Sequence, residues 1–321
     1  MTIDRFKDEL TDCVIKLAKP GEEITLRTIT KNNNTTRLVL SVKVPGGITV
    51  PSFYISELKH RYDSGMSIDK IAEEVLKRGR AHTLMSVPED VLSDDYSRFN
   101  VRIIYRLINY EEKREFISER PHRQLLDLAV VYYYYSREGD MNLGHISVNN
   151  SDIEKWGITE DDLYRDASCN TPALKPAVIK PLSDYVIEVF PEKEQSFDVT
   201  AGFPPGPWEI KDLSMIGDAI RNRCYVPLIV LTNELMNCGA ATILYKGLVQ
   251  AISDEIGSDL YIIPSSIHEV LIIPCVDYVI SPEELNAMIV DINVSTVSEE
   301  DVLANHAYLY DRERGVMKPL G

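Results

Sequence analysis

A hydroxyl pair, an imidazole and a carboxylate lie together in the polar turn Ser265–Glu269, between two apolar runs. Hydrolases use side chains of these types. In such an enzyme a hydroxyl nucleophile needs a base within hydrogen-bond reach. Ser266 and His268 are two positions apart, so on a strand they would share a face and could touch. One hypothesis is therefore a hydrolase with His268 as general base and Ser266, or a metal-bound water, as nucleophile. Glu269 completes the catalytic candidates.

A structural role for the same turn is the other interpretation. Serine hydrolases often place the nucleophile on a strained elbow such as G-x-S-x-G, and the sequence has no such elbow. Ser265 and Ser266 would then satisfy backbone groups of the turn, and His268 would bridge the end of the sheet. The sequence favours this structural interpretation over the catalytic one.

Metal and nucleotide motifs are incomplete. The pair His268-Glu269 begins like H-E-x-x-H, but position 272 is Ile, so the second histidine is missing. A site assembled from distant residues, for example His122 and Asp127 with His268, stays open as an alternative. No phosphate-binding G-x-x-x-x-G-K-[ST] and no G-x-G-x-x-G occurs. The sequence therefore predicts no metal site and no cofactor.

Four polar residues are candidates for binding a ligand: Asn170, Asn233, Asn237 and Ser265. Asn237-Cys238-Gly239 opens a predicted helix, whose first N–H groups could bind an anion. The alternative is that Asn237 caps the helix and Gly239 allows close packing. Asn170 and Asn233 stand where a helix meets a strand or loop, and a buried asparagine more often fixes the backbone than binds a ligand. We favour the structural reading of these residues as well.

Composition narrows the class of protein. The 321 residues are 44% hydrophobic and 26% charged, with 50 acidic and 34 basic residues and a net charge of -16. Such a negative field argues against nucleic-acid binding. Five cysteines without a Cys-x-x-Cys pair indicate free thiols in a reducing cytoplasm. The charged N-terminus is not typical of a signal peptide, and no apolar run reaches the roughly 20 residues of a membrane span.

Apolar periodicity predicts interleaved helices and short strands. Helices are expected over 3–18, 53–62, 68–76, 159–170 and 239–256. Two more are expected to begin at Ser281 and after Ser298. The helix from Ser281 should bury Leu285, Met288 and Ile289. Strands are expected over 24–30, 37–44, 101–108, 126–135, 186–190, 226–231, in the runs flanking Ser265–Glu269, and over 307–310. This pattern predicts an α+β fold of two α/β lobes, 1–140 and 141–321, with mixed, mainly antiparallel sheets flanked by helices. The polar segment 136–140 is the expected boundary.

Several motifs carry a resemblance to a known family. They are Asn233–Ala241, Ser258–Pro274, Pro51–Ile55, Pro121–Leu128, Trp156–Thr159, Ala167–Thr171 and Asp291–Ser295. Together they resemble domain of unknown function family 5688, found mainly in gut clostridia, over nearly the full length. The C-terminal half is also distantly similar to the uncharacterised YtpQ-type family. Neither resemblance implies an activity, a ligand or a catalytic residue.

The sequence supports two hypotheses about function. The preferred one is a non-enzymatic cytoplasmic module that binds an unknown protein or small-molecule partner, as an accessory or regulatory protein of bacterial mobile elements. It predicts that the motif residues are buried and hydrogen-bonded to the backbone. The alternative is the hydrolase with its site around Ser266 and His268.

Overall fold

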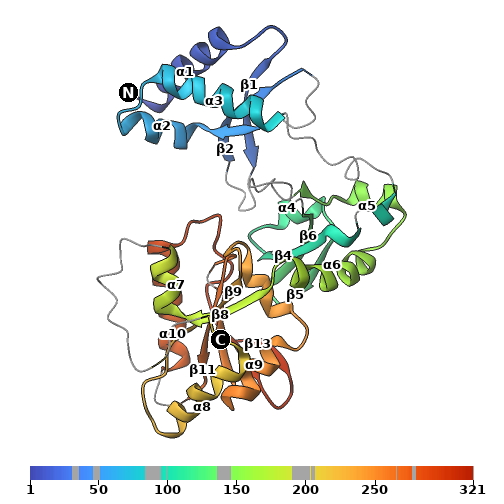
Figure 1. The fold of residues 1–321 in the computed structure, drawn as a ribbon, viewed down its shortest axis with the longest axis vertical. Helices are drawn as coiled ribbons and strands as arrows, with labels where there is room; N and C mark the ends of the chain where they lie inside the picture. The colour runs from blue at the N-terminus through green and yellow to red at the C-terminus, as the bar shows by residue number, and fades with distance from the viewer. Residues whose placement is uncertain are drawn as a thin grey trace. The chain divides into compact units, whose positions relative to one another are not determined.

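The computed structural model describes residues 1–30, 36–45, 51–83, 95–98, 100–135, 146–189, 203, 207–264, 266–276 and 280–320. The chain divides into two compact units, Met1–Asp94 and Asp95–Gly321 (Figure 1). Strand pairings within the described residues are antiparallel. The predicted α+β class with mainly antiparallel sheets is confirmed.

The segment expected to separate the lobes, 136–140, lies outside the described residues. The strands on either side of it belong to one sheet, because β7 (Ile146–Ser147) pairs with β6 (Leu128–Tyr134). The compact units divide earlier, between Asp94 and Asp95.

The N-terminal unit is a three-stranded sheet with helices packed against it. Its elements are α1 (Ile3–Leu17), β1 (Glu23–Thr30), β2 (Thr36–Lys43), β3 (Ser52–Tyr54), α2 (Ile55–Asp63) and α3 (Ile68–Thr83). The strands are ordered β1-β2-β3, and the predicted β1–β2 pair has the expected antiparallel register.

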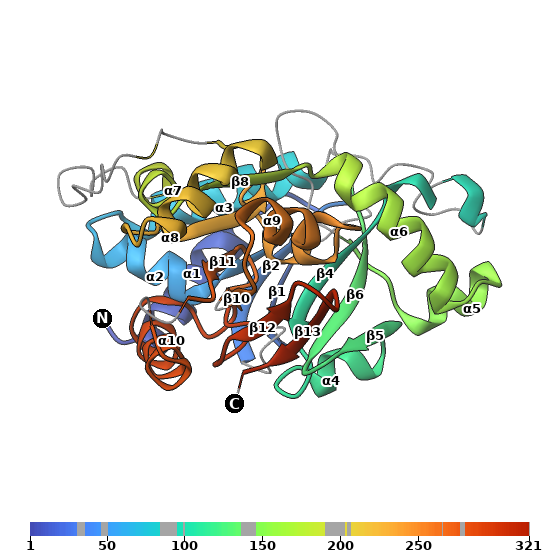
Figure 2. The same ribbon diagram turned by 90° about the horizontal axis from the view of Figure 1, so that it is seen from below.

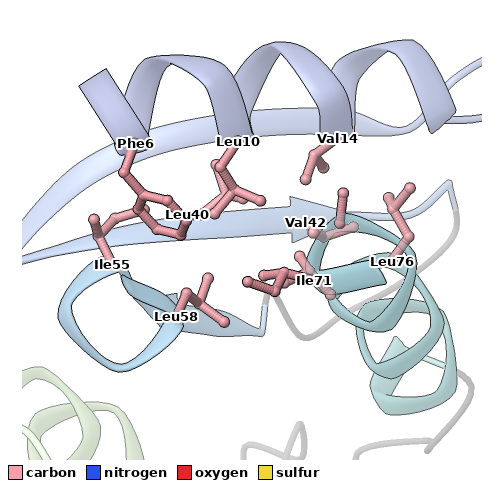
Figure 3. Packing of buried hydrophobic residues seen from close by; sticks show 11 residues of the cluster. Phe6, Leu10, Val14, Leu40, Val42, Ile55, Leu58, Ile71 and Leu76 are labelled. Atoms are coloured by element: carbon pink, nitrogen blue, oxygen red, sulfur yellow. The ribbon is translucent and has the colours of Figure 1, made fainter. Parts of the chain in front are cut away.

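One apolar cluster forms the core of this unit (Figure 3). Phe6, Leu10 and Val14 recur every four residues, so they share one face of α1. They meet β2 through Leu40 and Val42. The helices α2 and α3 add further buried side chains, including Ile55, Leu58, Ile71 and Leu76.

The C-terminal unit begins with a four-stranded sheet. Its elements are η2 (Tyr96–Arg98), η3 (Asn100–Arg102), β4 (Ile103–Asn109), α4 (Arg114–Ser118), β5 (His122–Leu125), β6, β7, α5 (Asn150–Trp156) and α6 (Glu160–Leu174). The tyrosine run of β6 points alternately to the two faces of this sheet. Tyr132 donates to Glu160 of α6, whereas Tyr133 and Tyr135 lie in the cluster with Ile104. Each of these tyrosines is buried, so their rings pack inside the unit.

The second sheet of this unit has six strands in the order β13-β12-β10-β11-β9-β8 (Figure 2). Its elements are β8 (Ala177–Pro181), α7 (Leu182–Val189), η5 (Ile210–Leu213), α8 (Ser214–Arg221), β9 (Ile229–Asn233), η6 (Gly239–Leu244), α9 (Leu248–Ile256), β10 (Leu260–Ile263), β11 (Val270–Pro274), α10 (Pro282–Thr296), β12 (Tyr308–Asp311) and β13 (Val316–Pro319). Leu285 and Ile289 of α10 pack on one face, against Tyr261, Ile263 and Ile273. The predicted strand pair around the Ser266–His268 turn is confirmed as the antiparallel pair β10–β11.

The segment 239–256, predicted as one helix, forms two helices. The first is the 3-10 helix η6 and the second is α9. Gly247 separates them with a φ of 74°, a left-handed conformation that glycine adopts without steric penalty. The predicted stop at Gly257 is confirmed, since its N–H bonds to the Ser253 carbonyl.

The helix predicted to end at Asn170 continues to Leu174 and contains Pro172. Proline removes one helical hydrogen bond and usually breaks a helix interior. Here two side-chain bonds hold the last turn. The Thr171 hydroxyl donates to the Ala167 carbonyl over 2.7 Å, and the Tyr245 hydroxyl donates to the Lys175 carbonyl over 2.6 Å.

Three further local predictions were wrong. The run 186–190, predicted as a strand, lies in helix α7 as far as Val189, because a short apolar run does not distinguish strand from helix. Ser298–Asp301 caps a turn and not a helix, through the Ser298 hydroxyl bonded to the Asp301 carboxylate. Met288, expected in the core, is 51% exposed.

Candidate functional site

The turn between β10 and β11 lies between two other segments of the chain. We call this arrangement the His268 junction: Asn233–Ala240, Pro264–His268 without residue 265, and Ser298–Ala304. On one side the Gly239 and Ala240 N–H groups donate to carbonyls of His268 and Ile267. On the other side the Ile267 N–H donates to Asp301, and the Ala304 N–H donates to Pro264. The turn is therefore bonded along both edges by main-chain groups.

Ser266 organises the backbone of this turn. Its side chain is buried, with 5% of the residue exposed, and it forms an isolated bridge with Val302. Its hydroxyl oxygen accepts the backbone N–H of His268 over 3.0 Å. The contact expected between Ser266 and His268 thus exists, but it joins the hydroxyl to the main chain and not to the imidazole.

The His268 ring is oriented by two groups from the flanking segments. Its Nδ1 accepts the backbone N–H of Cys238 over 3.2 Å. A nitrogen that accepts carries no proton, so in the neutral ring the proton is on Nε2. Nε2 lies 3.5 Å from Oδ1 of Asp301. The lone pair that a general base would use toward Ser266 is occupied by the backbone of Cys238.

The His268 carbonyl and Gly239 are packed without room for a side chain between them. This carbonyl accepts both the Gly239 N–H, over 2.9 Å, and the Thr232 hydroxyl, over 2.8 Å. A Cβ added at Gly239 would lie 2.2 Å from Thr232 Oγ1 and 2.5 Å from the His268 oxygen. The close packing expected at Gly239 is confirmed. The cap position of η6 is held by Cys238, with a φ of 52°, and not by Asn237.

The asparagine candidates also bond to the backbone. Asn233 is 1% exposed, and its carboxamide donates to the Asn237 carbonyl and accepts N–H groups from Leu235 and Asn237. Asn170 donates to the carbonyls of Asn100 and Ile103. Ser265, the remaining ligand candidate, lies outside the described residues.

The side chain of Glu269 makes its hydrogen bond to helix α7 and not to the ring of His268. Its carboxylate accepts the hydroxyl of Tyr185 in α7 over 2.7 Å. Burial, and then the Glu269 charge, raise the pKa of Tyr185, so the phenol stays protonated as the donor. Asp301, and not Glu269, is the carboxylate that faces the imidazole.

A buried lysine lies beside the junction and carried no sequence signal. Lys175 is 2% exposed, and its Nζ lies 3.4 Å from the Asn237 carbonyl and 5.6 Å from the Tyr135 ring centre. Burial lowers its pKa to about 8, an effect that the Cys238 thiol opposes and Arg106 reinforces. An amine of this kind is partly neutral near physiological pH.

A second group of polar side chains is centred on Asp127, whose partners His306 and Tyr308 the sequence did not indicate. Asp127 accepts from Nε2 of His306 over 2.9 Å and from the hydroxyl of Tyr308. Nδ1 of His306 lies 2.9 Å from the Ala307 carbonyl. His122 bonds elsewhere, through its Nδ1 to the Arg120 carbonyl. Within the described ranges, no group of three or more His, Cys, Asp or Glu residues could hold a metal ion.

The His268 junction holds three chain segments together. The Ser266 hydroxyl and the His268 ring, which were the catalytic candidates, make structural contacts with the backbone.

None of the helices in the described part of the chain has the length and apolar character of a membrane-spanning segment. Comparison with curated proteins and with solved structures finds no match. The sequence model of a family of unknown function, DUF5688, matches residues 3–312. The chain, including the whole His268 junction, therefore belongs to the DUF5688 family.

Proposed function

We propose that this chain is a non-enzymatic module that binds a protein partner, as an accessory or regulatory protein. The observation that carries the proposal is the hydrogen bonding of the His268 junction. The Ser266 hydroxyl, the His268 ring and the Asn233 carboxamide each bond to a backbone group. Buried polar groups that are satisfied by the backbone in this way rigidify and specify a fold, which supports a structural role for these three residues.

The hydrolase hypothesis requires a different geometry. A nucleophilic hydroxyl must donate to its base, and the base must be oriented by a third group. Here the Ser266 oxygen accepts from the His268 main chain, and Nδ1 of the ring accepts from Cys238. Asp301 faces Nε2, the nitrogen that carries the proton, as an orienting carboxylate would, but the other nitrogen accepts from Cys238 and not from a hydroxyl. These contacts favour the binding module over the hydrolase.

The expected setting of the module is a reducing cytoplasm. The support is that all five cysteines are free thiols. Disulfides are typical of oxidising compartments, and a chain of this size can bury an adequate core without them.

Hydrolysis assays on three serine and histidine variants test the proposal. We expect wild type, Ser266→Ala and His268→Asn to release p-nitrophenol from its acetate and phosphate esters no faster than buffer does. Ser295→Ala is the matched control, because Ser295 is exposed on α10 and bonds only within its own helix. Turnover by wild type and Ser295→Ala that both Ser266→Ala and His268→Asn lose while still folded would overturn the proposal.

A further inference from the structure

Helix α10 is apolar on sides that do not pack against its sheet. Its buried residues, Leu285, Ile289 and Asn293, lie four apart; the first two pack against the strands, and Asn293 donates to Ala304 and Asn305. Four other apolar residues of the helix are exposed: Met288 by 51%, Val290 by 44%, Ile292 by 43% and Val294 by 84%. We call these four the outer face of α10. Single exposed apolar residues are ordinary, but these four make a 15-residue helix apolar on both flanks of its buried face.

The four side chains form two rows along the helix. Met288 and Ile292 are four residues apart, as are Val290 and Val294, so the members of each pair are neighbours on the surface. The row Ala287–Asp291–Ser295 runs between the two apolar rows. A helix on the surface of a lone domain normally carries polar residues on its exposed sides. Helix α10 is apolar nearly all round, apart from a row with the single carboxylate of Asp291, and such a helix is typically covered on more than one side.

The charged residues of α10 and of the segment that follows it have a single sign. Ser281–Asp301 contains no Lys, Arg or His and six carboxylates: Glu283, Glu284, Asp291, Glu299, Glu300 and Asp301. Glu284 caps its own helix through Ser281, and Asp301 faces His268. Glu283 and Asp291 make no ion pair within the described residues. Their negative charge is available to a basic group that approaches the outer face.

We infer that the outer face of α10 binds a basic amphipathic helix of a protein partner. Apolar side chains of that helix pack against Met288 and Ile292 and against Val290 and Val294, and its Lys or Arg residues pair with Glu283 and Asp291. A second copy of this chain would bring two acidic helices together, and anionic lipid or nucleic acid would be repelled. The inference rests on the proposed function and specifies its partner by charge and shape.

A designed peptide tests this surface. The probe is a fluorescent amphipathic helix of Leu and Lys, about 18 residues long to give about five turns. Two control peptides carry Glu in place of Lys, or the same residues in scrambled order. We expect wild type to bind the first peptide in an anisotropy titration, with binding weakened by added salt, and to bind each control at least about tenfold more weakly.

Matched variants locate the binding. Val294→Lys and Met288→Lys should weaken binding by about tenfold or more, because each adds a charge of the peptide's own sign to the apolar contact. Val101→Lys is the control, since Val101 is 64% exposed and lies in η3. It should leave the affinity within about twofold. Hydrogen exchange should slow over 282–296 when the peptide is bound.

Three results would overturn the inference: no binding of the basic amphipathic peptide, equal losses in Val294→Lys and Val101→Lys, or self-association of wild type that Val294→Lys abolishes. The last result would assign the outer face to a second copy of the chain. None of them depends on the ester assays with Ser266→Ala and His268→Asn. Evidence against the proposed binding surface can therefore be distinguished from evidence against the non-enzymatic function.

Discussion

The ring of His268 and the backbone of Cys238 are joined by a hydrogen bond in which Nδ1 accepts the N–H over 3.2 Å. Cys238 has a left-handed backbone, with a φ of 52°, which costs a residue other than glycine about 1–2 kcal/mol. The bond explains why an imidazole stands in this turn without requiring a catalytic role for it.

Substitution of His268 should reduce the free energy of unfolding, and the loss should be smaller when the new side chain keeps an acceptor for the Cys238 N–H. His268→Ala leaves the Cys238 N–H without its partner, so we expect unfolding to become easier by about 1–2 kcal/mol. His268→Asn places a carbonyl oxygen near the position of Nδ1 and should lose less than half of that. Urea denaturation of both variants measures the difference. Equal losses in the two variants would show that the Nδ1 bond contributes little.

Gly239 should tolerate no side chain. Gly239→Ala forces a methyl group against Thr232 Oγ1 and the His268 carbonyl, so the junction must shift, and we expect a loss of about 3 kcal/mol or more. Gly157→Ala is the matched control, because Gly157 has a positive φ but nothing within 4 Å of an added Cβ. It should lose only about 1 kcal/mol. Thermal melting that ranks Gly157→Ala as the more damaging change would contradict this steric explanation.

Local signals predicted much of the fold. The hydroxyl caps of Thr159 and Ser281 begin their helices as expected, each with an acid three residues on. The β1–β2 and β10–β11 pairs also form where apolar runs flank polar turns. Caps and turns act within a few residues, so the sequence displays them directly.

The contacts that define the candidate site could not be predicted in the same way. The orientation of the His268 ring depends on Cys238 and Asp301. Each lies about 30 residues away in the chain, and only the tertiary fold brings them together. The pair Ser298-x-x-Asp301 was visible in the sequence, but its cap is compatible with a turn as well as with a helix. Lys175 has no motif at all, because burial is a property of the fold and not of the residue type.

The Asp127 carboxylate joins the two sheets of the C-terminal unit. It precedes β6 and accepts from His306 and Tyr308, of which Tyr308 begins β12. Asp127→Asn should cost about 1–3 kcal/mol, since an amide cannot accept both charge-assisted bonds. Tyr308→Phe should cost about 1 kcal/mol, and the double variant less than the sum of the two. The control Asp218→Asn removes an exposed ion pair with Arg221 and should have no measurable effect.

Lys175 should make the stability of the chain rise with pH between about 8 and 10.5. Its pKa is lowered to about 8 in the folded protein from an ordinary 10.5, so the unfolded chain binds more protons in that interval. Below pH 8 both states carry the charge, and its burial disfavours the folded state by about 3 kcal/mol. Lys175→Met removes the charge and keeps the apolar stem, so it should stabilise the chain by up to that amount at pH 7. The advantage should vanish by pH 10.5. Urea denaturation at a series of pH values gives both curves, and their difference cancels the titration of the tyrosines. A difference that stays constant with pH would mean that Lys175 keeps its ordinary pKa in the fold.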